Sequence, residues 1–114
     1  ERMRTLLDDE PWLFFTFDVA HAFSKSEAEA IRYIELCHDR LINVHISRFD
    51  RGKAHFSLNR HASMARVMEC LKDYRYNGGL TLEIEDMNFD CQLSAEEKIA
   101  ILSEDYTFMR GCME

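Results

Sequence analysis

Three short apolar runs, each followed by a segment with helical periodicity, constrain the fold of this chain more than any other feature. The runs cover residues 12–17, 41–46 and 80–84. They are rich in β-branched and aromatic residues, which is typical of strands covered on both faces by helices. We therefore expect their side chains, those of Trp12 and Phe14 included, to pack in the core.

The segments between and after the runs carry helix signals. Ser26 and Ser94 each begin a Ser-x-x-Glu capping box, which satisfies free N–H groups in the first turn of a helix. The first box predicts a helix to about residue 39, and the second predicts one that Gly111 ends. Apolar residues at helical spacing over residues 65–72 predict a third helix. The order strand, helix, three times over, predicts an α/β fold of three consecutive βα units with parallel strands.

Two connections are distinctive. Residues 47–59 are polar and predict a long loop, of the kind that is usually functional or mobile. Residues 77–79 read Asn-Gly-Gly and predict a tight turn before the third strand, because glycine accepts positive φ angles freely. With 114 residues the chain is one domain or part of one. It is too short for an eight-stranded βα barrel, which needs about 250 residues.

A polar residue stands at or next to the end of each run: Asp18, His45 and Glu83. The carboxyl ends of parallel strands meet at one edge of a sheet, so these three side chains predict a site. Their separations of 27 and 38 residues (45 − 18 and 83 − 45) bracket the length of a βαβ unit, roughly 30 residues. The alternative is structural: Asp18 and Glu83 would cap loops, and His45 would be a hydrogen-bonded core histidine.

Composition narrows the classes of partner. A formal net charge of −7 argues against nucleic acid, since such binding depends on clustered Lys and Arg, and favours small-molecule substrates. No apolar stretch approaches the roughly 18 residues of a membrane span. The four cysteines form no Cys-x-x-Cys pair, so they indicate the reduced thiols of a cytoplasmic protein, with a disulfide as the alternative. The opening ERMRTLLDDE looks like the end of a longer helix, so we expect a fragment.

Three motifs together resemble a known family. FTFDVAH, then NVHIS with a histidine ten residues later in KAHF, then YNGGLTLEIE resemble the last three βα units of the xylose isomerase-like TIM barrels. That superfamily includes sugar isomerases, sugar epimerases and endonuclease IV. The resemblance covers about residues 6–113. It implies that residues 1–114 are the C-terminal part of such a barrel, a partial TIM barrel with Asp18, His45 and Glu83 on strands six, seven and eight.

The resemblance also implies a cofactor and a reaction. In the family a Glu on strand five and the ligands of the next three strands hold a divalent ion, and those three ligands correspond to Asp18, His45 and Glu83. Carboxylates with one imidazole suit Mn²⁺, Mg²⁺ or Zn²⁺. In epimerase-like members the strand-eight Glu also moves the proton, so Glu83 is the expected catalytic base. The implied substrate is a small sugar or sugar phosphate.

Three further residues resemble substrate-contacting positions: His21, Arg51 and His55. His21 follows Asp18 in an Asp-x-x-His arrangement, with an exposed loop histidine as the alternative. Arg51 resembles the substrate-contacting arginine of the epimerases. It is a single arginine in a polar loop, so a chance match is an equal alternative. Lys53 stands where endonuclease IV has an aspartate, which disfavours the nuclease.

The expected function is the C-terminal portion of a metal-dependent sugar or sugar-phosphate isomerase or epimerase, inactive as an isolated chain. Residues 58–62 lack the Gly-x-Gly that the family often carries there, which puts the activity of the parent in doubt. The alternative is a non-catalytic fragment or a self-associating module. Three parallel strands leave two unpaired edges, so we expect either a homo-oligomer or a missing N-terminal half of the barrel.

Overall fold

Three parallel strands lie at the centre of the molecule, and they come from the three apolar runs. The computed structural model describes all residues, 1–114. The elements, in chain order, are α1 (Arg2–Asp9), β1 (Phe15–Asp18), α2 (Val19–Phe23), α3 (Glu27–Cys37), η1 (His38–Arg40), β2 (Leu41–Ile46), β3 (Arg48–Asp50), β4 (Lys53–Phe56), α4 (Ala62–Asp73), β5 (Gly79–Leu82), η2 (Asp86–Asn88) and α5 (Ala95–Met113).

The strand order in the main sheet is β1-β2-β5, and both pairs are parallel. β2 is central, with Phe17 opposite Val44 on one side and Val44 opposite Leu80 on the other. Helices follow each strand: α2 and α3 after β1, α4 after β2, and α5 after β5. The predicted α/β class, the parallel direction and the three βα units are therefore confirmed.

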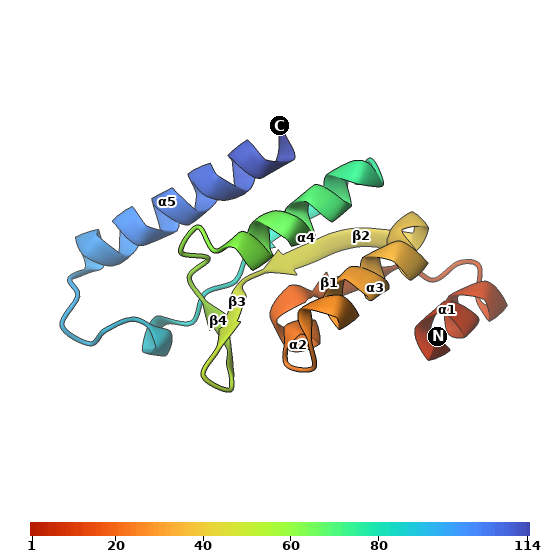
Figure 1. Cartoon of the computed structure of the whole chain (residues 1–114), viewed down its shortest axis with the longest axis horizontal. Helices are drawn as coiled ribbons and strands as arrows, with labels where there is room; N and C mark the ends of the chain where they lie inside the picture. Colours follow the sequence, from red (N-terminus) through yellow and green to blue (C-terminus); the bar gives the residue numbers. More distant parts are fainter.

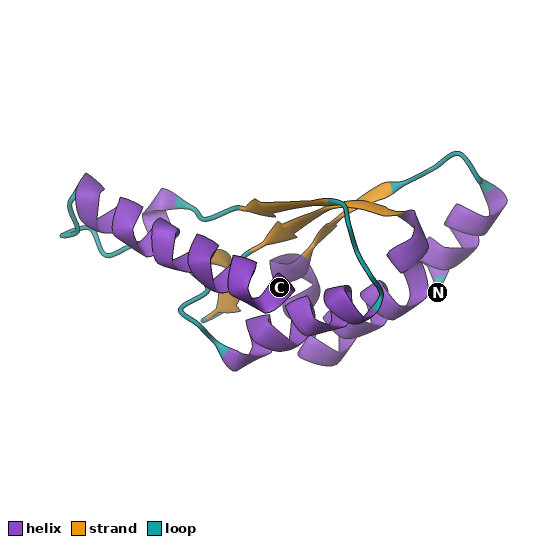
Figure 2. Ribbon diagram, turned by 90° about the horizontal axis from the view of Figure 1, so that it is seen from above, coloured by secondary structure: helices purple, strands orange, loops and turns teal.

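The helices lie along one side of this sheet, and no helix covers the other side (Figure 2). Successive side chains of a strand point to opposite faces. Phe17, Val44 and Ile46 are buried and join the core formed with α3 and α4. The opposite face carries polar residues, with Thr16 opposite Asn43 in the register. The expectation of strands covered on both faces was therefore wrong for this chain.

The first strand is shorter than predicted, because residues 10–14 form a turn that links α1 to the sheet. The N–H of Leu13 donates to the carbonyl of Glu10 within this turn. Trp12 is 71% exposed and Phe14 is 53% exposed, so the prediction that they pack in the core was wrong. Phe17 does pack there, with its ring 5.6 Å from that of Tyr33.

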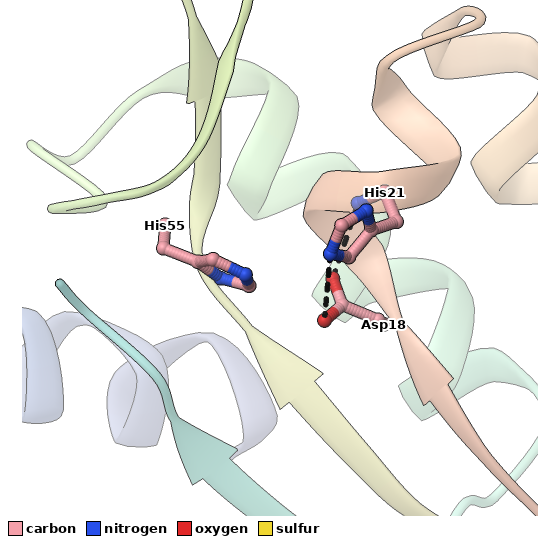
Figure 3. Close-up of side chains that lie close together, drawn as sticks. All are labelled: Asp18, His21 and His55. Atoms are coloured by element: carbon pink, nitrogen blue, oxygen red, sulfur yellow. Dashed lines mark hydrogen bonds and ion pairs between the residues drawn. The ribbon is translucent and has the colours of Figure 1, made fainter.

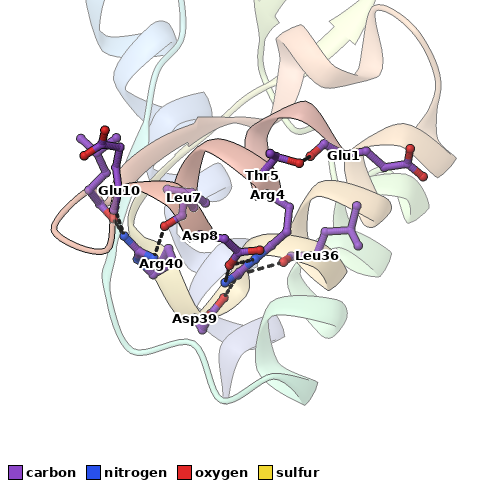
Figure 4. A network of polar contacts seen from close by, with 10 residues as sticks. Glu1, Arg4, Thr5, Leu7, Asp8, Glu10, Leu36, Asp39 and Arg40 are labelled. Carbon is purple, nitrogen blue, oxygen red and sulfur yellow. Dashed lines mark hydrogen bonds and ion pairs between the residues drawn. The ribbon is translucent and has the colours of Figure 1, made fainter.

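Two arginines fasten α1 to the rest of the molecule (Figure 4). Arg40 donates to three backbone carbonyls at the end of α1 and in the turn that follows, those of Leu7, Glu10 and Leu13. Arg4 bridges Asp8 of its own helix and Asp39 of η1. The hydrogen bond from Arg4 holds the pKa of the Asp8 carboxyl below its usual value. The opening residues are thus an ordered helix held by polar contacts.

The predicted helix signals differ in how far the structure follows them. Ser94 and Glu97 form a complete capping box, with both reciprocal hydrogen bonds present. Ser26 accepts from the N–H of Glu29, but the return bond is not formed. Gly111 does not end the last helix, which continues to Met113. A glycine supplies the freedom to leave a helix but does not require the chain to do so.

Residues 47–59 are not an irregular loop, because β3 and β4 form an antiparallel hairpin within them (Figure 1). Its turn uses positive φ angles at Arg51 (47°) and Gly52 (77°). The prediction of a long loop without secondary structure was therefore wrong. The hairpin extends from the carboxyl end of β2, at the edge of the sheet where the predicted site lies.

The segment after the hairpin takes glycine-like conformations without glycine. Asn59 and Arg60 both have φ angles of 49°. The buried carboxylate of Asp105 on α5 holds this segment by accepting from the Ser57 hydroxyl and from the N–H groups of Leu58 and Asn59. The missing Gly-x-Gly therefore does not prevent a left-handed turn here. After α4 the positive φ falls on Arg75 (58°), rather than on the glycines of the predicted turn at residues 77–79.

None of the helices has both the length and the apolar character that crossing a membrane requires. All four cysteines are free thiols. Cys37 is buried, Cys70 and Cys112 are partly buried, and Cys91 is exposed. Burial raises the pKa of the Cys37 thiol, and the same cause raises the pKa of Cys70 and Cys112.

Candidate metal centre

Asp18, His45 and Glu83 converge at the carboxyl edge of the sheet, as their positions in the sequence predicted. Each offers one potential ligand atom, and the three atoms lie within 4.8 Å of one another. Asp18 is opposite His45 in the register of β1 and β2. Glu83 follows β5 directly, and its N–H donates to the carbonyl of Ile46, which extends the ladder by one bond. We call these three residues the candidate metal centre.

Asp18 has a second, structural role, because it caps the short helix α2. Its Oδ1 atom accepts from the backbone N–H of His21 at 3.1 Å. An aspartate in this position satisfies an N–H group that the helix cannot pair internally. This hydrogen bond orients the Asp18 side chain at the end of β1. Its Oδ2 atom lies 3.8 Å from Nε2 of His21.

His45 and Glu83 contact each other directly. Nδ1 of His45 lies 2.8 Å from Oε2 of Glu83, and the two side chains are 32% and 44% exposed. Two carboxylates and one imidazole are hard and borderline donors that suit Mn²⁺, Mg²⁺ or Zn²⁺. The residues present therefore fit such an ion, and three protein ligands leave coordination positions for water or substrate.

Two of the predicted substrate-contacting residues lie beside Asp18 (Figure 3). His21 and His55 each place a ring nitrogen within 4.8 Å of the Asp18 carboxylate and of each other. Their rings meet edge to face, with centroids 5.2 Å apart. His21 comes from α2 and its side chain is 69% exposed, whereas His55 comes from β4 and is 12% exposed. The β3–β4 hairpin thus brings His55 to the carboxyl edge of the sheet.

His55 is held in an unusual backbone conformation. Its φ angle is 73°, which costs a non-glycine residue roughly 1–3 kcal/mol. Several contacts fix it there: its ring Nδ1 lies 3.1 Å from the hydroxyl of the buried Ser47, and its carbonyl accepts from Glu85 N–H and Asn88 Nδ2. Sequence reasoning missed Ser47 and Asn88. Ser47 directly follows the second strand, which was a usable signal, whereas nothing local identifies Asn88.

Arg51 differs from the other predicted site residues. It lies in the turn of the β3–β4 hairpin, where it pairs with Asp50 at 3.2 Å. Its guanidinium carbon lies 5.4 Å from the centre of the Phe56 ring. These contacts are not with the candidate metal centre. The side chain instead lines a separate cavity of about 550 Å³.

Comparison with known proteins gives one similarity and no function. No family model matches the sequence, and no solved structure matches it. The chain is 31% identical over 101 residues to an uncharacterized protein of Methanocaldococcus jannaschii, MJ1188. The matched region is 87% of this chain and 36% of that protein, so the chain spans about a third of the relative's length.

Proposed function

We propose that Asp18, His45 and Glu83 bind one divalent ion, Mn²⁺, Mg²⁺ or Zn²⁺, in a sugar or sugar-phosphate isomerase or epimerase. The observation that carries the proposal is the convergence of these three side chains, from three parallel strands, to within 4.8 Å. The carboxyl edge of a parallel sheet is where such enzymes place their chemistry. The motifs around the three ligands resemble those of the xylose isomerase-like TIM barrels.

The proposed roles follow from the contacts. A divalent ion held by Asp18, His45 and Glu83 would polarise a sugar carbonyl and so acidify the neighbouring C–H bond. Glu83 accepts that proton, because its carboxylate is partly exposed and has a free oxygen beyond the one near His45. His21 and His55 bind substrate hydroxyl groups on the side of Asp18.

In this proposal the sheet is part of a larger barrel, with β1, β2 and β5 as strands six, seven and eight. Its uncovered polar face, with Thr16, Asn43 and Thr81, then faces the barrel interior. A glutamate on the preceding strand of a longer cytoplasmic protein completes the ligand set. The length of the relative, of which this chain matches 36%, is compatible with such a protein. The isolated chain then has no appreciable turnover.

Metal titration tests the proposal without requiring catalysis. We expect the 114-residue chain to bind Mn²⁺ saturably, measured by loss of the EPR signal of the free ion. Glu83→Gln and Asp18→Asn should each weaken binding by about tenfold or more, as the loss of even an outer-shell contact to a metal site commonly does. Glu85→Gln is the matched control, because Glu85 is exposed, lies two residues away and is not in the cluster. Unchanged affinity after Glu83→Gln would contradict the assignment.

A second candidate function, a self-associating module, is favoured by a different observation. The strand order leaves β1 and β5 each with one unpaired edge, and Phe14 and Ile42 are exposed large apolar residues of the sheet region. The partner in this case is a second copy of the chain. A concentration-dependent dimer in analytical ultracentrifugation at micromolar protein would support this candidate, and a monomer would exclude it. A nuclease remains disfavoured by the net charge of −7 and by Lys53.

A further inference from the structure

A cavity that shares no residue with the candidate metal centre lies against the β3–β4 hairpin. It has a volume of about 550 Å³ and is formed by the β3–β4 hairpin and the segment around η2. Arg51 and Lys53 supply its two cations, and Phe56, Met87 and Phe89 supply its apolar wall. We call it the hairpin cavity.

Specific contacts hold the two walls of the hairpin cavity together. The side-chain amide of Asn88 in η2 donates to the carbonyls of Ala54 (2.8 Å) and His55 (3.0 Å) in β4. Phe56 is buried, and the guanidinium of Arg51 lies over its ring. The cavity is therefore defined by hydrogen bonds and packing between two segments more than 30 residues apart.

The charge around the hairpin cavity is opposite to that of the chain as a whole. Asp50 is the only carboxylate paired with Arg51, and it is shared with Arg48 at 3.5 Å. Lys53 forms no ion pair. Asp90, which also lines the cavity, is a second nearby carboxylate. The lining itself carries two cations, Arg51 and Lys53, and one carboxylate, Asp90, in a protein with a net charge of −7.

We propose that the hairpin cavity binds the phosphate group of a phosphorylated sugar, through Arg51 and Lys53. A guanidinium donates two hydrogen bonds to phosphate oxygens, and an ammonium group adds a second positive charge. The apolar wall suits the carbon face next to the phosphate. The inference rests on the proposed function for the sugar part: β4 carries Lys53, which lines the cavity, and His55, which has a ring nitrogen within 4.8 Å of the Asp18 carboxylate and its Nδ1 atom 3.9 Å from Glu83 Oε2.

NMR titration of the ¹⁵N-labelled 114-residue chain tests the proposal, with EDTA present to remove metal ions. The probes are fructose 6-phosphate, fructose and inorganic phosphate. We expect fructose 6-phosphate to shift amides of residues 51–56 and 87–90 saturably, with an affinity that falls as salt is added. Fructose should not do so. Inorganic phosphate should shift the same amides with a weaker affinity, because only the phosphate group is then recognised.

Substitutions in the hairpin cavity should change the affinity for fructose 6-phosphate in opposite directions. Arg51→Gln and Lys53→Gln should each weaken fructose 6-phosphate binding about tenfold, the loss expected for a hydrogen bond to a charged group. Asp90→Asn should strengthen fructose 6-phosphate binding, because it removes a negative charge that repels the phosphate group. The substitution keeps the side-chain oxygen that accepts from Gln92 N–H. Arg32→Gln, an exposed arginine on α3 paired only with Glu1, is the matched control and should have no effect.

The two proposals fail in distinguishable ways. Equal binding of fructose and fructose 6-phosphate, or binding unaffected by Arg51→Gln and Lys53→Gln, would overturn the phosphate assignment even if Mn²⁺ binds normally. Conversely, phosphate binding that depends on Arg51 in a chain that does not bind Mn²⁺ would leave this inference standing and remove the metal centre.

Discussion

Nδ1 of His45 lies 2.8 Å from Oε2 of Glu83, although the two residues are 38 positions apart in the chain. The contact exists because β2 and β5 are parallel neighbours, and Glu83 follows β5 by one residue. Both residues belong to the candidate metal centre, in which each offers one ligand atom. The protein therefore holds the two side chains together before any ion binds, which lowers the entropic cost of binding.

Asp18 combines helix capping with proposed metal binding, and two substitutions separate these roles. Asp18→Asn keeps an oxygen that accepts from the N–H of His21, so stability should change little while Mn²⁺ affinity falls. Asp18→Ala removes both functions, and loss of the cap should cost about 1 kcal/mol of unfolding free energy. Urea denaturation measures the free energy of unfolding, and Mn²⁺ titration measures the metal affinity. Equal stability losses for the two variants would contradict the capping role.

Asp105 should be one of the most sensitive positions for stability. Its buried carboxylate accepts from Leu58 N–H and Asn59 N–H. Asp105→Ala leaves the buried Leu58 N–H without a partner, whereas the exposed Asn59 N–H keeps the Ser57 hydroxyl. We expect a loss of about 1–3 kcal/mol in urea denaturation, the cost of one buried unsatisfied group. Glu104→Ala is the neighbouring control: it breaks an exposed pair with Arg60 and should cost less than about 1 kcal/mol. Similar losses for both variants would show that the carboxylate is not an anchor.

Arg40 should determine whether α1 stays docked. Arg40→Ala removes the donor for the carbonyls of Leu7, Glu10 and Leu13, so the opening residues should become accessible. Hydrogen exchange should accelerate in residues 2–9 while the amides of β2 keep their protection. Arg32→Ala, which breaks only the exposed pair with Glu1, should leave both regions as they are. Uniform loss of protection across the chain would instead mean that α1 is required for the whole fold.

The cysteines should differ in reactivity. Burial raises the pKa of the thiols of Cys37, Cys70 and Cys112, so a smaller fraction of each is the reactive thiolate at pH 8. Cys91 is exposed and should be alkylated first by iodoacetamide in the native protein. Peptide mass spectrometry over time gives the order. Denaturation in urea should remove the difference, and modification of Cys37 before Cys91 in the native state would contradict the packing.

Much of the architecture was predictable because its signals are local. The Ser94 box fixed the start of α5, and the apolar runs located all three strands of the main sheet. The signals failed where local chemistry permits more than one outcome. Gly111 allows a helix to end but lies inside α5. The aromatic residues Trp12 and Phe14 lie in the turn before β1 rather than in the core.

The hairpin shows the other limit of local reasoning. Residues 47–59 look polar and irregular, yet β3 and β4 pair and carry His55 to Asp18. Asn59 and Arg60 take left-handed conformations without glycine, and Asp105, more than 40 residues away, accepts from the N–H of Asn59. No pattern within the segment could have revealed that partner.

The sequence by itself determined that three strands alternate with helices and that each strand ends in a potential ligand. Those features follow from side-chain periodicity and capping, which act over a few residues. The tertiary structure decided that Asp18, His45 and Glu83 meet, that His55 joins them, and that Arg51 faces a different cavity. These outcomes depend on strand register and on contacts between distant segments, so they arise only when the whole chain is packed.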